Sequence, residues 1–203
     1  EKVTIIDNSA FVGNTALSTI TLQGNNLKTI GNNVFQNCTS LTSIDLPSSL
    51  ETIGNNAFYE CAALTDLLLP TSLRSIGDEA FDYCFSLKSL ILPNGLESIG
   101  YDAFGNCESL THITLPSSIT TIGDGAFSCC ESLTKITIPS SITSMGRGVF
   151  SGCGSLAVVI LESGITTVWS GIFGGCESLV KVVLPESVTS IGSGAFSSCS
   201  SLT

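Results

Sequence analysis

The apolar positions of the chain recur with a period of 23 residues. Eight Cys residues follow this spacing, eight Phe residues each precede a Cys by three positions, and an apolar residue precedes each Phe by five. The Cys positions are Cys38, Cys61, Cys84, Cys107, Cys130, Cys153, Cys176 and Cys199, and the Phe positions are Phe35, Phe58, Phe81, Phe104, Phe127, Phe150, Phe173 and Phe196. A fixed period in the twenties predicts a solenoid, in which each repeat forms one coil.

Full repeats cover most of the chain. The unit is best seen in residues 41–63, LTSIDLPSSLETIGNNAFYECAA, and returns at 64–86, 87–109, 110–132, 133–155, 156–178 and 179–201. Residues 17–40 form a coil with one extra residue, 1–16 form a partial coil, and 202–203 start another. Since a coil buries its apolar face only against its neighbours, we expect residues 1–203 to form a single solenoid domain.

Each unit begins with the alternation of a strand. Leu41, Ile44 and Leu46 are expected to face inward, and Pro47 to end the strand because it lacks the N–H group that a ladder needs. Gly54 then permits a turn, and residues 55–61 suit a single helical or 3₁₀ turn. The expected fold class is an α/β solenoid of the leucine-rich-repeat type, with a parallel sheet on one side and short 3₁₀ or helical turns and loops on the other.

The repeat resembles the BspA-like leucine-rich repeats, whose mark is LPxxLxxIGxxAFxxC, present here as LPSSLETIGNNAFYEC. Proteins of that family look like cell-surface or secreted adhesins. The resemblance implies an extracellular or cell-surface location and binding to a protein partner, such as host matrix or another cell surface, without catalysis. It transfers no binding residues, because the motif residues are the core. Local departures are Val34 in the Ala slot, Glu162 in the Pro slot and Trp169 in the Gly slot.

Composition narrows the classes of function. Only 12% of the 203 residues are charged, and the net charge is −10, which repels phosphate backbones and argues against nucleic acid as a partner. No apolar run is long enough to insert into a membrane. With one His and no nucleophile–base set, we expect no enzyme, no cofactor and no metal site. A start at Glu1 without Met favours a trimmed piece of a longer protein.

The Cys residues at the 23-residue spacing are expected to form a column of buried thiols. Side chains stacked in register point in parallel, which disfavours disulfide geometry, and a single row does not converge on a metal. Cys129 lies outside the spacing and is expected to point outward. The acids of the middle coils, among them Asp82, Asp102 and Glu108, are expected to solvate the surface, because no calcium-loop spacing accompanies them.

The outward residues of the predicted strands are the candidate partner-binding surface. Extended sheet surfaces are what solenoids use to bind partners, although β-propensity alone would also place Thr, Val and Ile there. The positions are Asp66, Leu68, Ser89, Ile91, His112, Thr114, Lys135, Thr137, Val158, Ile160, Lys181 and Val183. His112 is otherwise expected to be an ordinary solvated side chain. The alternative function is end-to-end self-association into a filament, since no polar cap is visible at either end.

Overall fold

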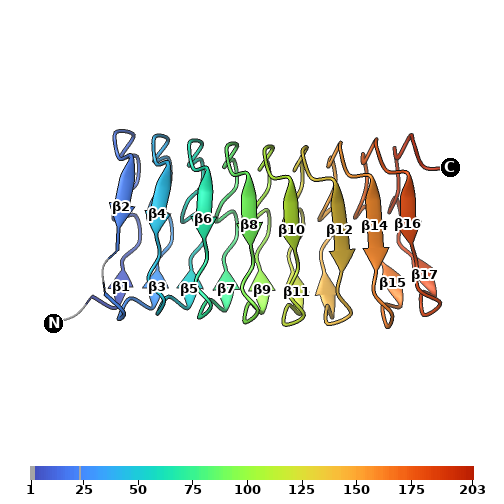
Figure 1. The fold of residues 1–203 in the computed structure, drawn as a ribbon, viewed down its shortest axis with the longest axis horizontal. Coiled ribbons are helices and arrows are strands. Elements are labelled where there is room, and N and C mark those ends of the chain that lie inside the picture. Colours follow the sequence, from blue (N-terminus) through green and yellow to red (C-terminus); the bar gives the residue numbers. More distant parts are fainter. Residues whose placement is uncertain (1–2, 23) are drawn as a thin grey trace.

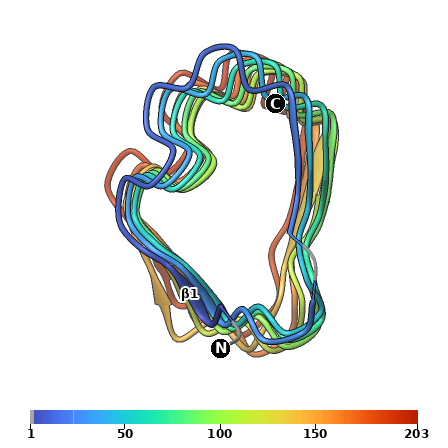
Figure 2. The same cartoon turned by 90° about the vertical axis from the view of Figure 1, so that its left-hand side faces the viewer.

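The chain winds into a parallel β-solenoid whose coils stack along one axis (Figure 1). The computed structural model describes residues 3–22 and 24–203; Glu1 and Lys2, which belong to the predicted partial coil, lie outside this part. Viewed along the axis, successive coils nearly superimpose around a common cross-section (Figure 2). The predicted leucine-rich-repeat solenoid of 23 residues per coil is therefore confirmed.

The first strand of each coil lies where the sequence predicts it. These longer strands are β2 (Thr19–Thr21), β4 (Ser43–Asp45), β6 (Asp66–Leu68), β8 (Ser89–Ile91), β10 (His112–Thr114), β12 (Lys135–Ile138), β14 (Val158–Leu161) and β16 (Lys181–Val183). They pair in parallel in the orders β2-β4-β6-β8-β10 and β12-β14-β16. Leu67 lies opposite Leu90, and Leu68 lies opposite Ile91, so equivalent side chains of neighbouring coils stand side by side.

A second parallel ladder, absent from the sequence prediction, follows the loop after each longer strand. Its strands are β1 (Ile5–Ile6), β3 (Thr29–Ile30), β5 (Thr52–Ile53), β7 (Ser75–Ile76), β9 (Ser98–Ile99), β11 (Thr121–Ile122), β13 (Ser144–Met145), β15 (Thr167–Val168) and β17 (Ser190–Ile191). The first seven strands form one sheet, and β15 and β17 form another. Each strand has only two residues, which is too short to leave a period-two pattern in the sequence.

The segment after the glycine forms hydrogen-bonded turns, where the sequence predicts a short helical turn. No helix is assigned anywhere in the described part of the chain. Asn56 and Glu60 adopt left-handed backbone conformations with φ of 55° and 56°, which interrupt right-handed helical winding. The N–H of Phe58 bonds the Ala80 carbonyl of the next coil at 2.7 Å, so this backbone is satisfied between coils and not within a helix.

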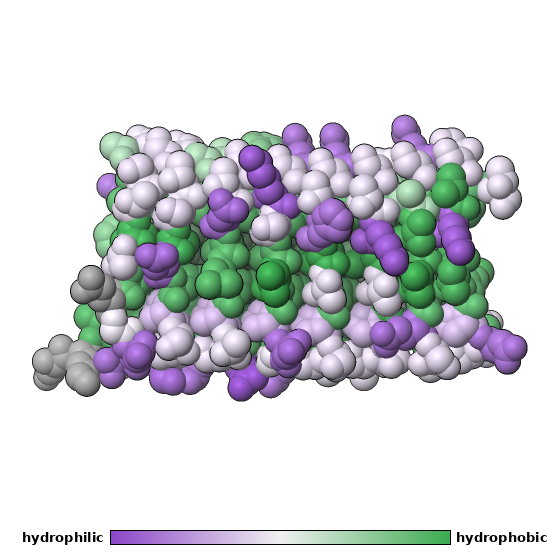
Figure 3. All heavy atoms as spheres, viewed as in Figure 1, coloured by the Kyte–Doolittle hydropathy of each residue, from purple (hydrophilic) through white to green (hydrophobic). Residues whose placement is uncertain are grey.

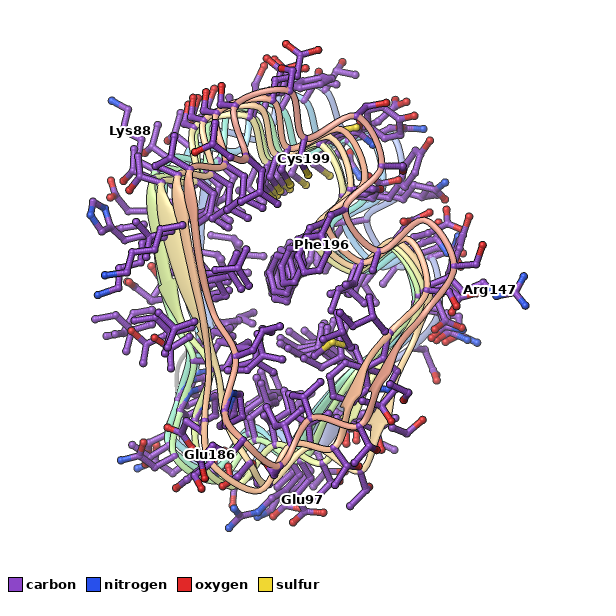
Figure 4. All side chains as sticks on the ribbon, turned by 90° about the vertical axis from the view of Figure 1, so that its right-hand side faces the viewer. Lys88, Glu97, Arg147, Glu186, Phe196 and Cys199 are labelled. Atoms are coloured by element: carbon purple, nitrogen blue, oxygen red, sulfur yellow. The ribbon has the colours of Figure 1, made fainter. Side chains whose placement is uncertain are left out.

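The core consists of stacked columns of identical side chains. The Phe rings lie face to face with centroids 4.9 Å apart between Phe58 and Phe81 and 5.9 Å apart between Phe150 and Phe173. Phe196 and Cys199 mark the ends of the Phe and Cys columns, which point into the interior (Figure 4). This regular packing explains why the apolar slots tolerate so little variation.

The glycine slot allows neighbouring coils to approach closely. A Cβ atom built on Gly77 would lie 2.7 Å from the backbone nitrogen of Asn55 in the preceding coil. Trp169 occupies this slot, and the short-strand ladder is interrupted between β13 and β15, the strand that Trp169 directly follows. We attribute the interruption to the Trp169 side chain, because two coils can approach this closely only where the residue in this position has no Cβ.

Candidate partner-binding face

The longer strands expose one face along the length of the solenoid, which we call the long-strand face. Figure 3 shows an apolar band running along this face, with polar side chains on either side. In β6 and β8 the outward residues are exposed and the central residue is buried, as the alternation predicts. The strand geometry therefore presents the predicted residues together on a single surface.

Leu68 and Ile91 are the most exposed apolar side chains of this face. Their exposed fractions are 76% and 74%, values far above those of core residues. They lie in register on neighbouring strands and border a shallow groove of about 290 Å³, which Asp66 and Ser89 also line. Contact with a partner would remove this exposed apolar surface from water, which favours binding at these two side chains.

A second groove lies where the longer-strand ladder is interrupted. β10 pairs with β8, and β12 pairs with β14, but no ladder joins β10 to β12. The groove there has a volume of about 420 Å³ and is lined by His112, Thr114, Lys135, Thr137 and Glu162, among others. This groove is larger than the one beside Leu68 and Ile91, and it coincides with the interruption of the ladder.

The lysines of the longer strands lie toward the C-terminal end of the long-strand face. Asp45 and Asp66 are exposed near the N-terminal end, whereas Lys135 and Lys181 are exposed toward the C-terminal end. His112 lies between them, exposed, with Nδ1 2.9 Å from the Thr111 hydroxyl. The exposed Glu162 lines the same groove as Lys135, so the C-terminal part of the face carries charges of both signs, and such charges orient a partner of complementary charge.

The predicted apolar residues of the C-terminal half are less accessible than Leu68 and Ile91. Val158 and Ile160 are half-buried. Val183 is 38% exposed, about half the value of Leu68. The accessible apolar surface is thus concentrated on β6 and β8.

Glu162 is a residue of this face that the repeat pattern did not single out as a contact. It stands where six of the coils carry Pro, and its carboxylate accepts a hydrogen bond from the Ser140 backbone N–H at 3.0 Å. The replacement itself is visible in the sequence. Its position beside the second groove follows from the packing of neighbouring coils, which no local pattern indicates.

The Cys column is a structural feature and is confirmed as a row of free, inward-facing thiols. Cys38 to Cys176 of the column are buried and Cys199 is half-buried. Each thiol donates to the carbonyl of the Phe in the preceding coil, with S···O distances between 3.1 and 3.4 Å. Burial raises the pKa of Cys61 and Cys176 to about 12, so these thiols stay protonated at neutral pH.

Cys129 lies less open to solvent than expected. It is half-buried, and its sulfur lies against the backbone of Gly152 in the next coil. Desolvation is the main cause that raises its pKa, followed by the charge of Glu131. Cys129 therefore lacks the electropositive, open surroundings of a reactive thiol.

Within residues 3–22 and 24–203, no group of three His, Cys, Asp or Glu side chains has the arrangement of a metal site. The same residues include no helix with the length and apolarity of a membrane span.

Comparison with known proteins identifies the repeat. The family model described as the BspA type leucine rich repeat region matches residues 1–89 and 74–203. No curated protein matches the chain significantly.

Three solved structures are similar over nearly the whole chain. A leucine-rich repeat protein from Bacteroides ovatus is 30% identical, with a TM-score of 0.65 over 99% of this chain and 69% of that one. The T. pallidum leucine rich repeat protein is 32% identical, with a TM-score of 0.67 over 98% and 82%. A leucine rich cell surface protein from Faecalibacterium prausnitzii is 30% identical, with a TM-score of 0.76 over 99% and 64%. The family model and these relatives agree with the observed coil, and the chain belongs to the BspA-type leucine-rich repeat family.

Proposed function

We propose that the chain is a non-catalytic adhesion module of a surface or secreted protein, which binds a protein partner along its long-strand face. The observation that carries this proposal is the pair Leu68 and Ile91, each about three-quarters exposed on adjacent strands. The partner class is a matrix protein or a protein on another cell surface. The similarity to a cell surface protein of Faecalibacterium prausnitzii supports this location.

The contact is expected to centre on the groove beside Leu68 and Ile91 and to extend toward Lys135. Buried apolar anchors contribute most of the free energy of a protein interface, and surrounding charges mainly set orientation and association rate. The exposed residues of β6, β8, β10 and β12 would thus form the interface, with Val158, Ile160, Lys181 and Val183 at its C-terminal edge.

Biolayer interferometry against a panel of immobilised, purified matrix proteins tests the proposal. For any matrix protein that binds, the Leu68→Ser/Ile91→Ser variant is expected to lower affinity at least tenfold, because two central apolar anchors are lost. The control variant Val3→Ser/Val12→Ser removes two exposed apolar side chains outside the longer strands and should bind normally. Equal affinity of both variants, or failure of the whole panel to bind, would argue against this function.

End-to-end self-association is a second proposal, supported by apolar side chains on both terminal coils. Ile5 is 56% exposed at one end, and Ile191 is 56% exposed at the other. Light scattering with negative-stain microscopy over a concentration series should then show rods, and Ile191→Lys should shorten them. Particles that stay at the 21.0 kDa mass of one chain at every concentration would refute it.

A further inference from the structure

Three aromatic rings gather on the turn segments of two neighbouring coils, apart from the long-strand face. Tyr59 and Tyr83 meet edge to face with their ring centroids 5.6 Å apart, and Tyr83 and Phe85 do so at 5.7 Å. Phe85 is 37% exposed, and both Tyr residues are half-buried. These turns carry the Cys column on their inner side, so the rings lie on the outer side of the same segments.

Carboxylates predominate around these rings, and the basic residue nearest to them in sequence is Lys88, three positions after Phe85. The turn segments 55–62, 78–85, 101–108 and 124–131 contain no Lys, Arg or His, and their acids are Glu60, Asp78, Glu79, Asp82, Asp102, Glu108, Asp124 and Glu131. Glu60 occupies the slot of Tyr83 in the preceding coil, and Glu108 occupies the slot of Phe85 in the following coil. The three rings therefore lie between carboxylates on both sides.

One of these carboxylates is largely buried and leaves one oxygen without a hydrogen-bond donor from the described part of the chain. Asp82 is only 5% exposed, and its Oδ1 accepts hydrogen bonds from the Tyr83 backbone N–H at 3.0 Å and from Asn106 Nδ2 at 2.9 Å. Among the residues that the structure describes, none donates to Oδ2. Gly105 holds the equivalent slot of the next coil, where a Cβ would lie 2.7 Å from Oδ1, so the carboxylate uses the space that this glycine leaves.

The surroundings of Asp82 lack a positive charge. Its pKa is raised to about 6: burial is the largest cause, the charges of Asp102 and Glu79 also raise the pKa, and the hydrogen bonds from Asn106 and Tyr83 lower it. A cation beside the free oxygen would relieve this desolvation and repulsion.

We propose that Tyr59, Tyr83 and Phe85, together with Asp82, Glu60 and Glu108, form a second interaction surface that binds an arginine- or lysine-rich segment of a protein partner. A guanidinium or ammonium group is attracted to an aromatic face and forms charge-assisted hydrogen bonds with carboxylates. This surface is separate from the long-strand face, and it holds whether or not that face binds a partner.

Fluorescence polarisation with a fluorescein-labelled peptide of eight arginines, at physiological salt, tests the aromatic contribution. The variant Tyr83→Leu/Phe85→Leu keeps the net charge and the apolar character but removes both rings. An exposed cation–π contact corresponds to roughly two- to fivefold in affinity, so the double variant should lose roughly 5- to 25-fold. Unchanged affinity in a variant with a native circular dichroism spectrum would overturn the proposal.

A matched pair of charge variants separates this surface from the general attraction of an acidic protein. Glu60→Gln/Glu108→Gln and Glu97→Gln/Glu186→Gln each remove two negative charges, but Glu97 and Glu186 lie across the cross-section from the Cys column (Figure 4). The first pair should weaken peptide binding several-fold more than the second. Equal losses would mean that only net charge matters, and the proposal would fail even if the aromatic variant did not fold.

Discussion

The Phe column makes stability depend on position along the solenoid, and Phe104→Ala tests this dependence. The Phe104 ring is fully buried between Phe81, whose centroid is 5.1 Å away, and Phe127, at 5.4 Å. Phe196 belongs to the same column but is half-buried and stacks on Phe173 alone, at 5.7 Å. The same substitution therefore removes two stacked contacts at one position and a single one at the other.

The expected losses follow from burial and cavity formation. Replacing a fully buried Phe by Ala costs about 3–5 kcal/mol, and the two stacked neighbours place Phe104 near the upper end. For Phe196, partial burial and an open side reduce the cost to about 1–2 kcal/mol. Phe104→Leu keeps most of the apolar volume and should cost about 1.5 kcal/mol.

Urea unfolding followed by circular dichroism measures these differences as changes in the midpoint at a constant slope. A reduced slope in the Phe104→Ala variant would indicate that the coils on either side unfold separately. The reasoning is refuted if Phe104→Ala and Phe196→Ala lower the free energy of unfolding by the same amount, because neither the fuller burial nor the second stacked ring of Phe104 would then contribute to stability.

Two further predictions concern the glycine slot and the thiols. Gly77→Ala should lower the free energy of unfolding by about 2 kcal/mol, because the added Cβ would overlap the backbone of Asn55. Gly154→Ala should have almost no effect, since no atom lies within 4 Å of a Cβ at that position. Equal shifts of the melting temperature in the two variants would contradict the close approach of the coils at Gly77. In the folded protein at pH 8, at most one thiol, that of the half-buried Cys129 or Cys199, should react with a thiol reagent, whereas all nine should react after denaturation. The reason is that desolvation keeps the pKa of the buried thiols well above pH 8. Rapid reaction of several thiols in the folded protein would disprove the buried column.

The sequence predicts the coil well because each slot is repeated. Cys61 and Phe58 return at the same spacing along the chain, so an error at any single position would not obscure the period. The second ladder escaped prediction because Thr52–Ile53 is too short to show alternation. The turns were expected to be helical or 3₁₀ because residues 55–61 are short enough for a single such turn. The left-handed backbone at Asn56 and Glu60 interrupts it, and neither residue indicates that conformation as clearly as a glycine would.

The candidate surfaces were predictable to different degrees. Strand alternation alone placed Leu68 and Ile91 on the outer face, and their exposure agrees with it. The second groove lies where the ladder is interrupted between β10 and β12, which is a property of the packed coils. The aromatic patch depends on three exceptions to the repeat, Tyr59, Tyr83 and Phe85, in three different slots of two coils. Only the winding of the coils reveals that these exceptions are neighbours.

The constant register of the coils has a consequence for how such a protein evolves. Hydrogen bonds between coils join residues 22 to 26 positions apart along most of the chain, and the Phe and Cys columns continue with the same step. Removing or duplicating a stretch of 23 residues therefore joins two faces that already match, wherever the cut falls within the coil. Recombination between repeats can thus lengthen or shorten the array without redesigning its interior, so selection acts separately on the number of coils and on the few outward positions that distinguish one coil from another.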